Sequence, residues 1–203
     1  MILPTRPQEP GAGNLVSAAM SNARTISIAL LAGAALALGA CATLQRGPVG
    51  NAAVPQPAKA VDLNRYAGLW YEIGRYENGF ERGCEGVSAE YTVRDDGLVG
   101  VLNTCRQGAT TGPVKTSQGK AKVVEGSDNA RLKVSFFGPF YLGDYWVLDH
   151  ADDYSWSIVG EPSGRYLWLL SRTAQPSPQI RDAILARARA LGYDLTLIRP
   201  TEH

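Results

Sequence analysis

A succession of eight short, strand-like runs with turn signals between neighbours constrains the fold more than any other feature. In the second run Val87, Ala89, Tyr91 and Val93 alternate with polar residues, the period of a half-buried strand. The turn that follows, Asp95-Asp96-Gly97, is a strong hairpin signal. The eight runs are 69–76, 87–94, 98–105, 115–124, 131–137, 141–148, 154–159 and 166–171. This pattern predicts an all-β fold, either an up-and-down barrel or a sandwich.

A single helix is predicted after the strands, between residues 177 and 192. Ser177 can cap it, Pro178 fits its first turn and Gly192 suits the position just past its end. One apolar stripe should face the strands and pack on the outside of the barrel, and its residues are Ile180, Ile184, Ala188 and Leu191. Arg187 interrupts the stripe and is expected to snorkel towards water. A last short strand, 195–198, is expected to pair near the start of the barrel.

The first forty residues have the features of an export signal that begins at Met20. A short basic start and an apolar segment too brief to span a bilayer precede small residues in 20–40. Residues 1–19, rich in proline and glycine, have no place in such a leader and are interpreted as an upstream extension or a mis-assigned start. Leu38-Gly39-Ala40-Cys41 is similar to the lipobox of bacterial lipoproteins, which implies cleavage before Cys41 and lipid attachment to its sulfur; a chance cysteine after an ordinary signal peptide is the alternative.

The segment that follows Cys41 contains mainly Pro, Ala, Gly and Gln up to residue 61. It has few large apolar side chains, so it cannot bury enough surface to order itself. We therefore expect 41–61 to be a flexible tether and 62–203 to be the folded domain. Ala42 follows the cysteine where aspartate is the usual retention signal of the inner membrane in enterobacteria. The expected location is thus the periplasmic face of the bacterial outer membrane, with the acyl anchor as the membrane contact.

Charge and composition exclude several classes of function. A net charge of +1 over 203 residues does not provide the basic surface that nucleic acids require. No cluster of His and Cys has the spacing of metal ligands, and no phosphate-binding loop is present. The two histidines are His150, in an acidic segment expected to form an exposed turn, and the terminal His203. We therefore predict no catalytic residue, metal or cofactor.

Two cysteines, Cys84 and Cys105, remain for the folded domain. Residues that pair across the hairpin centred on Asp95-Asp96 have numbers that sum to about 191, and these two sum to 189, so they should lie nearly opposite each other. The periplasm is oxidising enough for two thiols to form a disulfide. A bridge that closes this loop would stabilise the fold by about 3 kcal/mol. The alternatives are two free thiols, or one reactive thiol that serves as a nucleophile.

The order of short motifs along the chain resembles the lipocalins, and in particular the outer-membrane lipocalins of bacteria. Gly68-x-Trp70 opens the first strand, Asp152-Asp153-Tyr154 joins two later strands, and Leu169-Leu170-Ser171-Arg172-Thr173 precedes the helix. The resemblance extends from about residue 62 to residue 199. It implies an eight-stranded up-and-down antiparallel barrel, the lipocalin calyx, with the C-terminal helix packed outside.

The resemblance also implies structural roles for five motif residues: Gly68, Trp70, Asp153, Tyr154 and Arg172. Trp70 is expected at the closed base of the barrel, with the Arg172 guanidinium over its ring, a cation–π contact of about 1–2 kcal/mol when desolvated. Tyr154 and Asp153 should form the turn at the same end. The aspartate that commonly stands three residues before this tyrosine is replaced by Ala151, which leaves the details of that turn open.

Alternation along the strands predicts what faces the interior. If Arg172 points inward, so do Leu170, Trp168 and Tyr166, and if Trp70 does, so does Glu72. A carboxylate there would need a buried partner or water. The segment from Phe136 to Tyr141 is similar to the mouth region of bacterial lipocalins. The predicted ligand contacts are thus Phe140, Tyr141, Tyr166 and Trp168, with plain core or rim packing as the alternative.

The leading functional hypothesis is a membrane-anchored protein that holds a small amphiphile in the barrel. A fatty acid such as palmitate or a lysophospholipid fits a calyx with space for one ligand, for transport, storage or envelope maintenance. A lipid-modifying enzyme would need Glu72 or a free Cys84 in the calyx, and a haem binder would need an inward histidine. A structural lipoprotein with a filled barrel is the third alternative.

Overall fold

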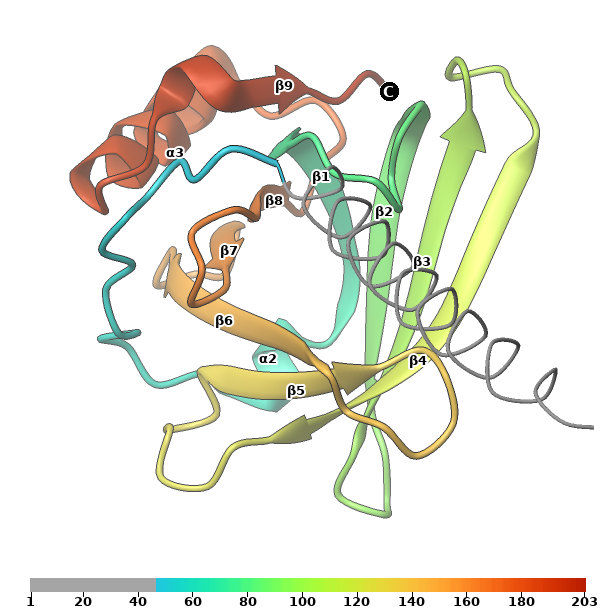
Figure 1. Cartoon of the computed structure of the whole chain (residues 1–203), viewed down its shortest axis with the longest axis vertical. Coiled ribbons are helices and arrows are strands. Elements are labelled where there is room, and N and C mark those ends of the chain that lie inside the picture. The colour runs from blue at the N-terminus through green and yellow to red at the C-terminus, as the bar shows by residue number, and fades with distance from the viewer. Residues whose placement is uncertain (1–46) are drawn as a thin grey trace, which may run out of the picture. The chain divides into compact units, whose positions relative to one another are not determined.

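The computed structural model describes residues 47–203, which form a closed antiparallel β-barrel (Figure 1). The predictions for residues 1–19, for the leader 20–40 and for lipid attachment at Cys41 lie outside the described residues. The strands are β1 Gly68–Tyr76, β2 Cys84–Val93, β3 Val99–Gln107, β4 Val114–Val123, β5 Arg131–Ser135, β6 Gly143–His150, β7 Trp156–Gly160, β8 Leu167–Ser171 and β9 Ile198–Pro200. The eight predicted runs match β1 to β8 to within a few residues, and the predicted barrel is confirmed.

The sheet follows the sequence order from β2 to β8, then β1, and a further β1–β2 pairing closes it. Strand β1 pairs with β2 only over its first half, from Gly68 to Tyr71. Over its second half, from Gly74 to Tyr76, it pairs with β9 instead. The C-terminal tail bridges the separation between the two strands, because Gly86 N donates to Glu202 O at 2.7 Å. The strand predicted at 195–198 is instead a 3-10 helix over Leu195–Leu197, and the pairing begins at Ile198.

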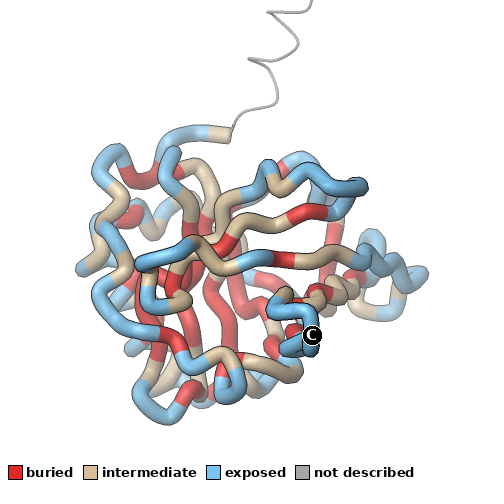
Figure 2. Tube along the Cα trace, turned by 90° about the horizontal axis from the view of Figure 1, so that it is seen from below, coloured by how far each residue is buried: buried red, intermediate tan, exposed pale blue. Residues whose placement is uncertain are grey.

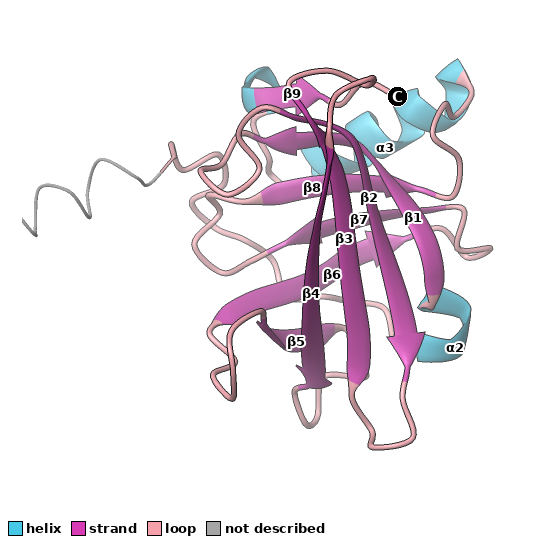
Figure 3. Ribbon diagram, turned by 90° about the vertical axis from the view of Figure 1, so that its right-hand side faces the viewer, coloured by secondary structure: helices cyan, strands magenta, loops and turns pink. Residues whose placement is uncertain are grey.

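The short helix α2, Leu63–Tyr66, lies at the start of β1 and marks the closed base of the barrel (Figure 3). The Asp62 side chain caps it by accepting a hydrogen bond from Asn64 N at 2.9 Å. The chain then passes through Gly68, whose φ of 90° suits glycine, into the first strand. The loops at the opposite, open end are 77–83, 108–113, 136–142 and 161–166.

The second helix, α3 (Pro178–Ala190), packs outside the barrel as predicted, with Ser177 as its cap. Ile184 and Ala188 are fully buried against the outer face of the strands. Arg187 does not simply snorkel, because its guanidinium forms an ion pair with the buried carboxylate of Asp149 on β6. In the part of the chain that the structure describes, neither helix is long and apolar enough to cross a membrane.

The core has two main layers, one on each face of the strands. Figure 2 shows the buried residues distributed along the strands of the barrel. One layer fills the base and interior of the barrel and includes Trp70, Tyr66, Val101 and Leu170. The other lies between the outer face of the strands and α3 and includes Ile158, Leu169 and Ile184. Strands buried on both faces explain why β7 and β8 are almost wholly apolar.

Residues 47–61 were expected to belong to a flexible tether, and the structure corrects this prediction. Gly50 N donates to Gly164 O at 2.9 Å, Asn51 Nδ2 donates to Leu191 O at 2.9 Å, and Val61 is buried. Apolar burial is small along this segment, as its composition indicates. Hydrogen bonds to other parts of the domain hold the segment in place instead of apolar packing. Composition alone does not reveal which groups will form these bonds.

Candidate ligand-binding cavity

The base of the barrel is built around Trp70, which is fully buried. The Arg172 guanidinium lies 3.8 Å from the centre of its ring, as the resemblance implied. Arg172 Nη1 also donates to Leu69 O at 2.8 Å, and Trp70 Nε1 donates to Tyr66 O at 2.8 Å. Burial lowers the pKa of Arg172, but the guanidinium remains the cation of this contact because its ordinary pKa is so high. The base is therefore closed by packing and by backbone acceptors.

The turn between β6 and β7 holds Asp153 and Tyr154 at the same end. Tyr154 adopts φ 61°, and its main-chain N donates to Ala151 O at 2.9 Å. The Tyr154 hydroxyl accepts a hydrogen bond from Asp62 N at 2.9 Å, and Asp153 Oδ1 accepts one from Ser155 N at 2.9 Å. The turn is thus held by the main-chain carbonyl of Ala151 and by the side chain of Asp153.

His150 was expected in an exposed turn, and this prediction was wrong. It ends β6 with 5% of its surface exposed and stacks on Tyr154 with ring centroids 4.3 Å apart. Its ring nitrogens lie 2.8 Å from Ala151 O and 3.2 Å from Ala60 O. The acidic neighbours suggested a surface turn, but Asp149 is buried by its ion pairs with Arg187 and Lys59. His150 is a structural residue of the base.

An apolar cavity follows the barrel axis from the base to the open end. Its empty volume is about 900 Å³ when the open solvent at the mouth is included, and the space inside that can hold the centre of a water molecule is about 100 Å³. Aliphatic and aromatic side chains form most of its wall, among them Val87, Val99, Val101, Leu132, Val147 and Leu170. Such a wall would exclude water from an acyl chain and offers few groups for a charged ligand.

Among the predicted ligand contacts, Trp168 lines this cavity, whereas Tyr166, Phe140 and Tyr141 do not. Tyr166 precedes β8, so alternation does not extend to it, and it stacks on Trp168 at 5.8 Å. The Tyr141 ring lies 4.8 Å from Lys122 Nζ. Because Ala121 lines the cavity, its neighbour Lys122 points outward, and Tyr141 therefore lies on the outer surface. Contact of these residues with a ligand stays a prediction.

The mouth is lined instead by Phe80, Glu81 and Phe136, which were not predicted as contacts. Phe136 belongs to the aromatic segment 136–141, in which Phe140 and Tyr141 were the predicted contacts. Phe136 itself is the residue of this segment that lines the cavity. Gly119 provides its space, because a Cβ there would lie 2.8 Å from the Phe136 ring. Phe80 lies in the loop after β1, where no strand alternation indicates which side chains face inward.

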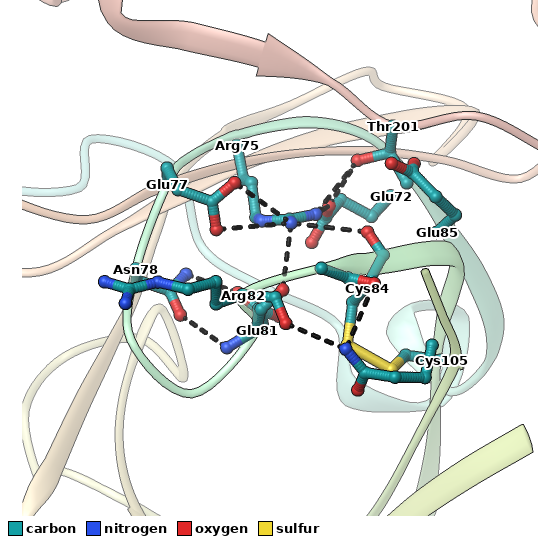
Figure 4. The surroundings of a disulfide bond; sticks show 12 residues. Glu72, Arg75, Glu77, Asn78, Glu81, Arg82, Cys84, Glu85, Cys105 and Thr201 are labelled. Atoms are coloured by element: carbon teal, nitrogen blue, oxygen red, sulfur yellow. Dashed lines mark hydrogen bonds and ion pairs between the residues drawn. A yellow bond between two sulfur atoms is a disulfide. The ribbon is translucent and has the colours of Figure 1, made fainter. Parts of the chain in front are cut away.

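A β-bulge in β1 places two opposite charges together at the cavity, and Glu72 is one of the residues that line it. The register of β1 against β8 shifts between Glu72 and Gly74, so Glu72 and Arg75 face the same side. Arg75 Nη1 lies 2.7 Å from Glu72 Oε1, and both side chains are buried, with 0% and 2% of their surface exposed. Figure 4 shows Arg75 between Glu72 and Glu77, below the C-terminal tail. The bulge thus supplies the buried partner that a carboxylate at Glu72 required.

Burial raises the pKa of Glu72 to about 7, because desolvation and the nearby Glu81 carboxylate outweigh the effects of Arg75 and Thr201. The Thr201 hydroxyl donates to the same carboxylate oxygen that Arg75 contacts. Arg75 Nη2 donates further to Glu81 O at 3.0 Å and Cys84 O at 3.3 Å. The ion pair therefore also ties the mouth loop to β1.

The loop 77–83 covers one side of the mouth and is held by its own polar contacts. Trp168 Nε1 donates to Glu81 Oε2 at 3.0 Å, and Asn78 Nδ2 donates to the same oxygen. Phe80 stacks on Tyr166 with centroids 5.9 Å apart, yet 64% of its surface is exposed. This side of the mouth combines an aromatic surface with a carboxylate.

Cys84 and Cys105 form a disulfide, with Cα atoms 5.4 Å apart (Figure 4). The bridge joins β2 to β3 at the open end, beside the loop 77–83. Both cysteines are buried. Their pairing leaves no free thiol at Cys84, and the described residues contain no cluster of three metal-ligating side chains.

The comparisons with known proteins agree with this geometry. A family model for a lipocalin-like domain matches residues 61–203. The outer membrane lipoprotein Blc of Vibrio cholerae is 42% identical over 155 residues, which cover 76% of this chain and 90% of the relative. Blc of Escherichia coli K12 is 41% identical over 148 residues, 70% of this chain and 82% of the relative. Temperature-induced lipocalin-1 of Arabidopsis thaliana is 37% identical over 150 residues, 70% of this chain and 80% of the relative.

Solved structures share the same fold. Insecticyanin from the tobacco hornworm Manduca sexta superposes with a TM-score of 0.58 at 20% identity, over 78% of this chain and 87% of that one. Lobster apocrustacyanin A1 superposes with a TM-score of 0.55 at 18% identity, over 77% of this chain and 93% of that one. At these identities the likeness concerns the fold alone.

Proposed function

The chain belongs to the lipocalin family, and from that premise we propose that it is a lipid-anchored carrier of a small amphiphile at the bacterial outer membrane. The amphiphile is a fatty acid, a lysophospholipid or a molecule of similar shape. The observation that carries the proposal is the apolar cavity along the barrel axis, which opens between the loops 77–83 and 136–142.

The distribution of polar groups supports an orientation for the ligand. The wall around Val101, Leu132 and Val147 is apolar, whereas Glu81 and the exposed Phe80 lie at the mouth. An acyl chain would extend towards the base, and each buried methylene would contribute about 0.8 kcal/mol. The head group would remain at the mouth, where water solvates its charge at little cost.

Anchoring and location rest on the sequence and on the relatives. Two relatives from different bacteria are named outer membrane lipoproteins, and Leu38-Gly39-Ala40-Cys41 provides the lipobox for the same anchor. A Cys41→Ser variant should leave the outer-membrane fraction and remain soluble in the periplasm or uncleaved. If it stayed firmly in that fraction, the lipid anchor would be refuted while the carrier function could still be tested.

The carrier function is tested by titrating the purified protein with saturated fatty acids of increasing length. Affinity should rise with length until the cavity is filled, and tryptophan emission should change on binding because Trp168 lines the cavity. Trp168→Phe should remove most of that signal, whereas Trp156→Phe, on the side of α3, should retain it. Flat affinity across all lengths with unchanged emission would contradict a carrier and favour a structural barrel.

A further inference from the structure

Three tyrosines bring hydroxyl groups together at the floor of the largely apolar cavity. Tyr66 comes from α2, Tyr91 from β2 and Tyr145 from β6, and all three line the cavity. The Tyr145 hydroxyl lies 2.9 Å from the hydroxyls of both Tyr66 and Tyr91. The Tyr66 hydroxyl also lies 3.0 Å from Ser157 Oγ. Four hydroxyl groups from distant parts of the chain thus form one continuous chain of hydrogen bonds.

The end of this hydroxyl chain fixes the direction of its protons. Ser157 Oγ lies 3.4 Å from Asp149 O, a carbonyl that can only accept, so Ser157 donates there. Each hydroxyl has one proton, and Ser157 therefore accepts from Tyr66. By the same reasoning Tyr66 accepts from Tyr145, and Tyr145 accepts from Tyr91.

The opposite direction would leave the Tyr91 proton without an acceptor. Within residues 47–203 the Tyr91 hydroxyl contacts only the Tyr145 hydroxyl. Reversing the chain would point its O–H into an apolar cavity, and an unsatisfied buried donor is costly. In the favoured direction every proton is donated, and the Tyr91 oxygen presents free lone pairs to the cavity. The floor is thus a hydrogen-bond acceptor, not a donor.

We propose that this floor is a recognition subsite for a hydroxyl group at the buried end of the ligand. The inference rests on the proposed carrier function and narrows its ligand class to amphiphiles whose far end bears a hydrogen-bond donor, such as an ω-hydroxy fatty acid. The ligand hydroxyl donates to Tyr91, in line with the proton order of the chain. A terminal carboxylate can only accept, so it would require the proton order to reverse and Ser157 to give up its hydrogen bond to Asp149 O.

The test compares binding of a saturated fatty acid, its ω-hydroxy form and its ω-methoxy form, each of the length that fills the cavity. The unmodified chain should bind the ω-hydroxy acid at least as tightly as the parent acid. The ω-methoxy acid, which has no proton to donate, should bind about tenfold more weakly or worse, as expected for a buried polar group without a partner.

The matched variants are Tyr91→Phe and Tyr71→Phe, each of which removes one phenolic hydroxyl from the barrel wall. Tyr71 does not line the cavity. Tyr91→Phe should weaken binding of the ω-hydroxy acid about tenfold more than binding of the parent acid, and Tyr71→Phe should behave as the unmodified chain. The Tyr145–Tyr66–Ser157 bonds remain in Tyr91→Phe, so the fold should persist.

Two outcomes would overturn the inference, and they differ from failure of the carrier function. If Tyr91→Phe and Tyr71→Phe lost the same affinity for the ω-hydroxy acid, Tyr91 would not be the group that recognises its hydroxyl. Equal binding of the ω-hydroxy and ω-methoxy acids would refute the need for a donor. In both cases the parent acid still binds and the carrier function stands. If no acid of the series binds, the carrier function fails and the inference with it.

Discussion

The indole nitrogen of Trp168 donates a hydrogen bond of 3.0 Å to the carboxylate of Glu81. One partner lies on a barrel strand and the other on the loop 77–83, so this bond holds the mouth loop against the cavity wall. The residue expected to report ligand binding therefore also contributes to the position of the loop.

Removing this bond should loosen the loop. A hydrogen bond to a charged group contributes about 1.5–3 kcal/mol, so Trp168→Phe should make opening of the loop at least about tenfold more frequent. Limited digestion with trypsin after the exposed Arg82 would measure this as faster cleavage. Trp156→Phe, which leaves the loop contacts intact, is the control. Equal cleavage rates in both variants would mean that the bond does not restrain the loop.

The contact between Arg172 and Trp70 predicts non-additive losses of stability. Arg172→Ala and Trp70→Ala should each destabilise the fold, and the double variant should lose less than the sum by about 1–2 kcal/mol. Chemical denaturation of the four proteins measures the difference. Strictly additive losses would contradict a direct interaction at the 3.8 Å separation observed here.

The buried Glu72 predicts a pH dependence of stability. Burial raises its pKa from the ordinary value of 4.5 to about 7, so between these values the folded state binds more protons than the unfolded chain. The free energy of unfolding should therefore fall as pH rises through this window, by at most about 1.4 kcal/mol per pH unit from this group. Glu72→Gln should flatten the profile, since the amide that replaces the carboxyl group cannot ionise, whereas Glu90→Gln, at an exposed position, should not. A profile for Glu72→Gln as steep as that of the unmodified chain would assign the effect to another group.

The attachment of residues 47–61 predicts a requirement for glycine at position 164. Gly164 has φ 64°, and a Cβ there would lie 1.8 Å from Asn51 O. Gly97 also has a positive φ, of 77°, but its Cβ would meet nothing within 4 Å. Gly97→Ala should therefore cost about 1 kcal/mol from backbone strain alone, and Gly164→Ala should cost more and expose 47–61 to proteolysis. Equal effects of the two substitutions would mean that close contact with Asn51 is unimportant.

Much of the barrel could be predicted because its determinants are local. The alternation of Val87, Ala89, Tyr91 and Val93 follows from strand geometry alone, and Ser177 and Gly192 mark the ends of a helix by the backbone chemistry of those positions. The Cys84–Cys105 bridge was also predictable, because a tight turn at Asp95-Asp96-Gly97 sets the register of the two strands that it joins.

The eight strands, the helix and the disulfide could thus be predicted from the sequence pattern and the closed base from the family resemblance, whereas the residues that line the cavity depend on contacts between distant strands. The bulge between Glu72 and Gly74 turns Arg75 towards Glu72, and Tyr141 lies outside the barrel beside Lys122 of β4. These outcomes depend on how β1 meets β8 and β9, and β4 meets β5, when the barrel closes. Alternation continues along a strand only while its register with the neighbouring strands is unbroken, and that register is set by residues distant in sequence.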